Sequence, residues 1–370
     1  MNVKKFKKYA YASAFIALLS CSPAWAEPSE TPEELQKSGP EYMRTEGIDS
    51  EEAYQEQSAE QEEIINNNIS QDEVNIPIFD MRGDDGVLMS FRPSGITFLS
   101  PNRILVTDEN NQQLHIFDIE GRRFRRVANP RSLSQPRYTG LSNIENNKFF
   151  AVGSHYHQNN NVRYVWARSV LHMYELRGEI FTDSSAEINY DPELAWRNTG
   201  HYGEMTENPL RVEGVACDPI DDIIYFGLSK PADENGKITV LTLPLSQVME
   251  KKRKLKFENF DSDLLLGTDP LTEEPFVLTD ICCVPERGLL FLLSSKSKDE
   301  RRAGSSQIWF QANGSQNARL IADQIAPGNF ASGLGVLQRG EAFDIGLVFD
   351  NNPELNDTPS RFMILKDIDI

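Results

Sequence analysis

The chain has 370 residues, and its 56 acidic side chains outnumber its 37 basic ones, which gives a formal net charge of −19. This charge argues against nucleic acid as a main partner, because phosphate binding needs a basic surface. The mean hydropathy is −0.46, and no apolar run approaches the roughly 20 residues of a transmembrane helix. The composition therefore indicates a globular protein without a transmembrane segment, and it identifies no chemistry.

Residues 1–26 have the features of a secretory signal peptide. Four lysines among the first eight residues precede a short apolar run from Tyr9 to Leu19, and Ala24-Trp25-Ala26 is a small-x-small cleavage site. These features predict a periplasmic protein that begins at Glu27. Alternatively, Leu18-Leu19-Ser20-Cys21 resembles a lipobox, which would give a lipoprotein anchored through Cys21.

Residues 27–75 form a compositionally distinct segment. Between positions 27 and 73 there are 15 acidic and two basic residues, with few aromatic ones. Such a segment cannot bury enough apolar surface to offset the loss of chain entropy on folding. We therefore expect a disordered acidic linker, which acts either as a solvating spacer or as an arm for a basic partner.

Three cysteines follow Cys21, namely Cys217, Cys282 and Cys283. An odd number in an exported protein leaves at least one thiol outside an intramolecular disulfide. Cys282 and Cys283 would point to opposite faces of a strand, so they should not pair with each other. The alternatives are three buried free thiols or a bond from Cys217 to one of the other two.

From residue 76 onward the sequence contains a repeat. A small or acidic residue, often followed by glycine, leads into two short apolar strands joined by a turn. The copies begin at Ser94, Thr139, Glu213, Thr279 and Ser332. A third strand follows each copy, at 114–120, 171–176, 238–245, 307–311 and 361–366, and a more polar fourth strand is visible at 122–128 and 317–325. Four strands per repeated unit predict an all-β fold, a five- or six-bladed β-propeller over residues 76–370.

The ends of the repeat region predict how the ring closes. The last copy ends with its third strand, whereas the segments 76–80 and 86–92 resemble outer strands that have no unit of their own. We expect these N-terminal segments to complete the last blade, because closure removes exposed sheet edges. Long loops such as 182–212 would account for the excess length per blade.

The repeat also predicts which side chains meet. The loop that enters the first strand of a blade and the loop that leaves the second lie on one face, near the central channel. Polar and charged residues occupy these positions, and we selected the following as candidate ligand-binding residues: His155, His157, Glu213, Lys230, Asp280 and Lys296.

Several of these residues have two interpretations. His155 and His157 would project to one side of an extended segment as metal ligands, or they belong to an exposed loop. Glu213 enters a buried strand, where an acid needs a partner or a function, and Lys230 is its candidate ion-pair partner. Asp350 and Asn351, with Glu213, offer oxygen ligands for calcium, although Asp350-Asn351-Asn352 could equally cap a turn.

Parts of the sequence resemble known propeller families. EGVACDPIDDIIYFGLSKP, followed by ITVLTL, is similar to exported bacterial propellers of unknown function with an EGLA motif and a strand ending GLR-P. AVGSHYHQ with the following Arg163 and Arg168 resembles the Ser-His motif of that family, which adds Arg168 to the candidate ligand-binding residues. VFDNNPELNDTPSRFMIL resembles the esterase-like phytase family. The resemblance covers about residues 90–370, and Lys230 stands where the family has arginine.

Three functions follow as expectations. The first is a binding or interaction module whose top face takes a small anionic ligand or a protein. The second, implied by the phytase resemblance, is a hydrolase of phosphorylated or other esters, with calcium as a candidate cofactor. The third is a structural partner of an envelope protein. The sequence contains no GxSxG, HExxH or P-loop motif that would specify an enzyme.

Overall fold

The structure is a computed structural model, and it describes residues 76–109, 113–127, 138–145, 147–153, 170–177, 180–189, 211–230, 235–250, 255–298, 302–350 and 359–370. The predicted signal peptide and acidic linker therefore lie outside the described residues, as do His155, His157, Arg168 and Asn351. The blades belong to one compact unit, Ile69–Ile370. Within the described ranges, no helix is both long and apolar enough to cross a membrane.

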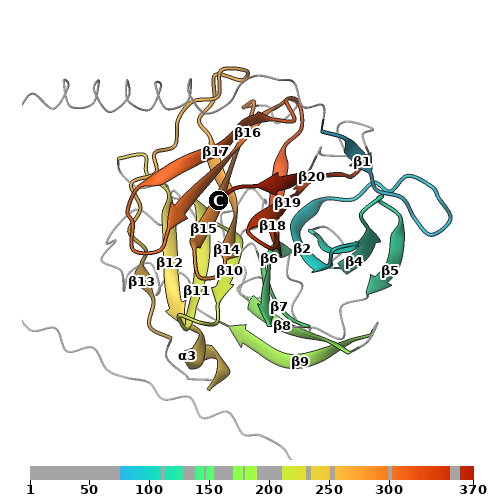
Figure 1. Cartoon of the computed structure of the whole chain (residues 1–370), viewed down its shortest axis with the longest axis horizontal. Coiled ribbons are helices and arrows are strands. Elements are labelled where there is room, and N and C mark those ends of the chain that lie inside the picture. Colours follow the sequence, from blue (N-terminus) through green and yellow to red (C-terminus); the bar gives the residue numbers. More distant parts are fainter. Residues whose placement is uncertain are drawn as a thin grey trace, which may run out of the picture. The chain divides into compact units, whose positions relative to one another are not determined.

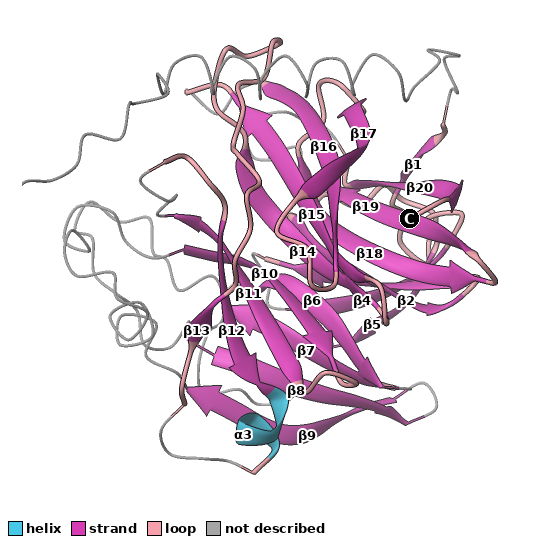
Figure 2. Ribbon diagram, turned by 60° about the vertical axis from the view of Figure 1, so that its left-hand side comes forward, coloured by secondary structure: helices cyan, strands magenta, loops and turns pink. Residues whose placement is uncertain are grey.

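Five antiparallel sheets of four strands form the blades of a β-propeller, which confirms the predicted fold and settles the number of blades at five (Figures 1 and 2). Blade 1 contains β2 (Pro93–Ser100), β3 (Arg103–Asp108), β4 (Gln113–Asp118) and β5 (Arg123–Val127). Blade 2 contains β6 (Tyr138–Glu145), β7 (Lys148–Gly153), β8 (Val170–Arg177) and β9 (Ile180–Asn189).

Blade 3 contains β10 (Arg211–Asp218), β11 (Ile223–Lys230), β12 (Thr239–Pro244), the short helix α3 (Leu245–Met249) and β13 (Glu258–Asn259). Blade 4 contains β14 (Val277–Val284), β15 (Gly288–Lys296), β16 (Ala303–Ala312) and β17 (Ala318–Ile325). Blade 5 contains β18 (Ala331–Arg339), β19 (Ala342–Phe349), β20 (Arg361–Ile368) and β1 (Ile78–Asp80). The innermost strands contact one another in the cyclic order β2, β6, β10, β14, β18, so the ring is closed.

The ring closes through β1, as predicted for segment 76–80. This strand pairs antiparallel with β20, with Phe79 opposite Phe362, and it completes the sheet that the last copy leaves one strand short. Segment 86–92 does not form the second outer strand that we expected, because it forms only one bridge, between Leu88 and Arg82. The turn at 83–86, with Gly86 at a φ of 78°, reverses the chain instead.

The predicted loop 182–212 also begins differently. Its first residues belong to β9, which pairs with β8 from Val170 opposite Asn189 to Arg177 opposite Ile180. A polar sequence such as FTDSSAEIN can form an outer strand, since an edge strand has one partner and needs little apolar surface.

Glycines in the repeat allow the inner strands to meet near the axis. Gly95, Gly140, Gly214 and Gly333 occupy equivalent positions, immediately after the first residue of each copy. A Cβ atom added to Gly140 would lie 2.7 Å from the backbone nitrogen of Val215, which no real side chain tolerates. Blade 4 has Asp280 at this position.

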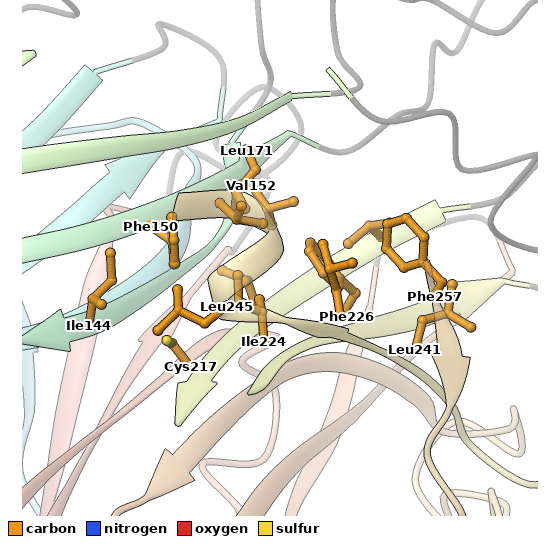
Figure 3. Packing of buried hydrophobic residues seen from close by; sticks show 14 of the residues in the cluster. Ile144, Phe150, Val152, Leu171, Cys217, Ile224, Phe226, Leu241, Leu245 and Phe257 are labelled. Atoms are coloured by element: carbon orange, nitrogen blue, oxygen red, sulfur yellow. The ribbon is translucent and has the colours of Figure 1, made fainter. Parts of the chain in front are cut away.

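Apolar layers between neighbouring blades form the core. Figure 3 shows the layer between blades 2 and 3, where Phe150 and Leu171 of blade 2 belong to one cluster with Phe226 of blade 3 and where Leu245 of α3 lies among them. Burying each such side chain contributes on the order of 1.5–3 kcal/mol. Cys217 belongs to this layer, and burial raises the pKa of its thiol to about 12. Cys217, Cys282 and Cys283 are all free thiols, but only Cys217 is buried, whereas Cys282 and Cys283 are partly exposed.

Candidate functional site

A cavity of about 260 Å³ lies where the inner strands begin and the second strands end, and we call it the top cavity. All five first residues of the repeat line it: Ser94, Thr139, Glu213, Thr279 and Ser332. Residues that end or follow the second strands line it as well: Glu109, Ser229, Lys230, Lys296 and Asp350. The structure thus places four candidate residues, Glu213, Lys230, Lys296 and Asp350, around one cavity built by all five blades.

The hydroxyl groups at the floor of the cavity connect neighbouring blades. Ser94, Thr139 and Ser332 each donate to a backbone carbonyl of the next blade, at the residue just before the first repeat residue of that blade. Thr279 instead donates to the carbonyl of Leu292 in its own blade at 3.2 Å, and Ser294, behind the lining, takes its place at the seam. The bonds are Ser94 to Tyr138 at 2.5 Å, Thr139 to Val212 at 2.9 Å and Ser332 to Pro93 at 2.6 Å, and Ser294 serves the seam between blades 4 and 5 with a 2.7 Å bond to Ala331. These hydroxyls therefore join neighbouring blades by hydrogen bonds, a role that sequence analysis did not assign to them.

Glu213 replaces the hydroxyl in blade 3 and has a different set of contacts. Its Oε1 forms an ion pair with Nε of Arg211 and accepts a 3.3 Å hydrogen bond from Ser229. The predicted ion pair with Lys230 is absent among the described residues. The register of β10 and β11 shifts on both sides of Val212, so the regular pairing is interrupted where Glu213 lies, and Lys230 is paired with Arg211. Arg211 is the base that reaches the carboxylate of Glu213.

The side chain of Glu213 is only 13% exposed, and its pKa is raised. Burial is the largest cause and the charge of Glu109 adds to it, whereas Arg211, Lys296 and Ser229 act in the opposite direction. A carboxyl group with a raised pKa at the wall of a cavity can exchange a proton when a charged ligand arrives. Arg211 is a site residue that sequence analysis missed, although its spacing of two from Glu213 on a strand was a usable signal.

Two lysines bring positive charge to the same cavity. Lys230 is exposed at the end of β11 and has no carboxylate partner within the described ranges. Lys296 ends β15, and its Nζ lies 5.3 Å from the ring centroid of Phe330, which also lines the cavity. A third lysine, Lys298, has its Nζ 3.6 Å from an oxygen of Glu274.

Asp350, a candidate calcium ligand, takes part in an ion-pair network. Its Oδ2 accepts hydrogen bonds from Nε and a terminal nitrogen of Arg92 at 2.9 and 2.6 Å, and Glu109 lies 3.4 Å from the same guanidinium. Within the part of the chain that the structure describes, no three or more His, Cys, Asp or Glu side chains form a group that could hold a metal ion.

Asp280 does not line the top cavity. It is fully buried at the axis, and its two oxygens accept hydrogen bonds from the backbone N–H groups of Ile281 at 2.8 Å and Leu334 at 2.7 Å. Burial raises the pKa of this carboxyl well above its ordinary value, the nearby charge of Glu213 raises it further, and the two N–H groups oppose both effects. Asp280 connects the inner strands of blades 4 and 5 and has no access to a ligand in the cavity.

No protein-family model matches the sequence, and no curated protein sequence matches it. Solved structures resemble it at low identity. The Malassezia sympodialis allergen Mala s 1 is 11% identical with a TM-score of 0.44, covering 74% of this chain and 92% of its own. A luciferin-regenerating enzyme is 8% identical with a TM-score of 0.42, covering 80% and 99%. A Bacteroides thetaiotaomicron protein of unknown function is 9% identical with a TM-score of 0.37, covering 78% and 75%. Likenesses this distant carry no information about ligand or activity.

Proposed function

We propose that this β-propeller binds a small anionic ligand in the top cavity. The observation that carries the proposal is Lys230, an exposed lysine at the cavity wall with no carboxylate partner among the described residues. The four carboxylates of the cavity each lie beside a basic side chain: Glu109 and Asp350 beside Arg92, Glu213 beside Arg211, and Glu274 beside Lys298. An anion would supply the partner that Lys230 lacks among the described residues.

The charge balance supports the same conclusion. Five basic side chains line the cavity, namely Arg92, Arg211, Lys230, Lys296 and Lys298, against the four carboxylates. A cavity with a positive surplus is unusual on a chain whose net charge is −19. Confinement within low-dielectric walls strengthens the attraction that such a cavity exerts on an anion.

The proposal is tested by calorimetric titration of the whole protein with small carboxylates, inorganic phosphate and phosphate monoesters. We expect at least one anion to bind, and Lys230→Met to weaken its binding at least ~10-fold, since a charge-assisted contact is worth about 1.5–3 kcal/mol. Lys256→Met is the matched control, because Lys256 is exposed, pairs with Glu258 and does not line the cavity. We expect Lys256→Met to bind the anion like the wild type. The proposal fails if no anion binds, or if Lys230→Met binds the anion as tightly as Lys256→Met does.

Ester hydrolysis with calcium is the alternative that the phytase resemblance implies. Carboxylates at the cavity wall, such as Asp350 and Glu213, are the kind of ligand that calcium prefers, but each already contacts an arginine. Assays with nitrophenyl esters and nitrophenyl phosphate, with and without calcium, separate the two functions. Turnover that Asp350→Asn abolishes would replace binding by hydrolysis as the function of the cavity.

The proposal includes export to the bacterial periplasm, on the strength of the signal-peptide features of residues 1–26. N-terminal sequencing and mass spectrometry of the mature protein distinguish a chain that starts at Glu27 from one lipidated at Cys21. A role of segment 27–75 in contacting an envelope protein is tested by deleting it and comparing the proteins that co-purify.

A further inference from the structure

Apolar residues contribute part of the lining of the top cavity. They are Phe330 and Val277, which are half-buried, with Pro275 and Pro93, and we call these four residues the apolar wall. Phe330 precedes β18, and its position is fixed because its carbonyl accepts a 2.9 Å hydrogen bond from the backbone N–H of Asp350. An inorganic anion would leave this wall in contact with water, whereas a ligand with an apolar body would cover it.

The aromatic ring and a lysine ammonium are neighbours on this wall. Nζ of Lys296 lies 5.3 Å from the centroid of the Phe330 ring, close enough for a cation–π contact. A ligand whose anionic group meets a lysine would therefore place the atoms next to that group against an aromatic surface. Because Phe330 is only half-buried, a flat apolar group that packs against the exposed part of its ring, beside the ammonium of Lys296, would satisfy both contacts at once.

The size and charge of the cavity limit the ligand further. Its volume of about 260 Å³ lies just below the roughly 300–1,000 Å³ of clefts that hold drug-sized molecules, so the ligand is small. Five basic and four acidic side chains leave a surplus of one positive charge. A second negative charge on the ligand would meet repulsion from Glu109 and Glu213, which are both largely buried and poorly screened by water.

We infer that the top cavity selects small organic monoanions with a flat apolar body, of which aromatic monocarboxylates are the simplest class. The inference rests on the proposed function, since it assigns a chemical class to the anion bound there. The carboxylate interacts with the lysines of the cavity and the apolar body covers Phe330. Inorganic phosphate and polyphosphorylated compounds are disfavoured by the acidic side chains.

Four probes test this inference on the full chain by calorimetry at constant ionic strength: acetate, benzoate, phthalate and inorganic phosphate. Benzoate should bind at least ~10-fold more tightly than acetate, because it covers apolar surface that acetate leaves exposed. Phthalate, with its second carboxylate, should bind more weakly than benzoate. Phe330→Ala should remove the difference between benzoate and acetate, and Phe330→Leu should retain part of it. Leu271→Ala is the control, since Leu271 is 55% exposed and does not line the cavity.

The outcomes separate this inference from the proposed function. Equal binding of acetate and benzoate, with Lys230→Met still weakening both, overturns the inference and leaves anion binding intact. Phosphate or phthalate binding more tightly than benzoate also overturns it. Failure of all four probes overturns the inference, and the proposed function is overturned with it if phosphate monoesters do not bind either. Thermal melts establish that each variant is folded, and if Phe330→Ala is not, the wild-type ranking and Phe330→Leu decide.

Discussion

Two positions at the centre of the propeller depart from the repeat, and their environments differ. Blade 3 has Glu213 where the other blades have serine or threonine, and blade 4 has Asp280 where the others have glycine. Asp280 is sealed in the axis and bonded to two backbone N–H groups. Glu213 lies at the cavity wall, and its bonds with other described residues are to the side chains of Arg211 and Ser229. The comparison teaches that a residue that departs from a repeat marks an unusual site. Hydrogen bonds to backbone groups indicate that the residue stabilises the fold, whereas bonds to side chains at a cavity leave another role open.

The partners explain the difference in terms of what each acid adds to the fold. Asp280 satisfies the N–H of Leu334 on the neighbouring blade, which a glycine at the same position could not do. Glu213 has no equivalent benefit, because an ionised carboxylate has no proton to donate to the next blade, as Ser94, Thr139 and Ser332 do. Asp280 therefore stabilises the contact between blades 4 and 5. Glu213 makes no such contact between blades among the described residues, and its place in the lining of the top cavity is consistent with a role there.

Asp269 is a third buried acid, and its replacement should have a larger effect on stability than the replacement of Asp280 or Glu213. Asp269 accepts hydrogen bonds from the backbone N–H groups of Leu271 and Ser305 and from the hydroxyls of Thr272, Ser295 and Ser305. Asp269→Ala strands these donors, so we expect a loss of about 3–5 kcal/mol in the free energy of unfolding, measured by urea denaturation. Because the same loop continues into Glu274 and Pro275, anion binding should weaken as well. A loss below about 1 kcal/mol would contradict the role of Asp269 as an anchor.

The pH dependence of Asp269 gives this prediction a second readout. Burial, the largest influence, opposes ionisation, but the hydrogen bonds led by those from Ser295 and Ser305 outweigh it and hold the pKa below the ordinary 3.8. A lowered folded-state pKa adds stability above the unfolded-state pKa and loses it as the pH falls through the folded-state value. The difference in stability between wild type and Asp269→Ala should therefore shrink below about pH 4.

Asp280→Ala should have the next largest effect. Two buried N–H groups lose their acceptor at about 1–3 kcal/mol each, and relief of the buried charge returns part of this. We expect a net loss of about 2–3 kcal/mol at neutral pH by urea denaturation, and a smaller one for Asp280→Asn, which retains one acceptor oxygen. Since the folded-state pKa is raised, the contribution of Asp280 is fully present below the ordinary 3.8 and declines as the pH rises. A variant as stable as the wild type would show that the two N–H groups find other partners.

The fold was predictable because pairs of short apolar strands that recur with a glycine near the start of most copies leave a local trace in the sequence. The convergence of Glu213, Lys230 and Lys296 was predictable for the same reason, since equivalent positions in a repeat lie around one axis. Pairing within the site was not. Whether Glu213 meets Arg211 or Lys230 depends on strand register, and whether Asp280 faces a cavity or backbone N–H groups depends on the packing of two blades, neither of which repeat position determines.

Protonation of Glu213 should make anion binding stronger at low pH. Burial raises the pKa of Glu213 above the ordinary 4.5, so this carboxyl becomes neutral once the pH falls below the raised pKa. Loss of a negative charge at the cavity wall removes repulsion toward an anionic ligand. Affinity for benzoate should therefore rise on acidification in the wild type, until the ligand itself is protonated.

The smallest expected effect comes from returning Glu213 to the residue type of the other blades. Glu213→Ser supplies a hydroxyl that can donate across the seam to blade 4, as Ser94 and Thr139 donate across theirs, and it removes a carboxyl that burial disfavours in its charged form. Arg211 loses its partner, but its side chain is 29% exposed and can be hydrated. We expect a gain of about 0.5–1 kcal/mol in unfolding free energy at neutral pH. We also expect benzoate to bind about fivefold more tightly, and the rise in affinity on acidification that Glu213 causes to disappear.

Glu213→Gln is the control, since it removes the charge without supplying the short hydroxyl, and its stability should stay within about 1 kcal/mol of the wild type. A loss above ~2 kcal/mol in both variants would show that the Glu213–Arg211 ion pair is a structural element, and the two central acids would then serve the fold alike.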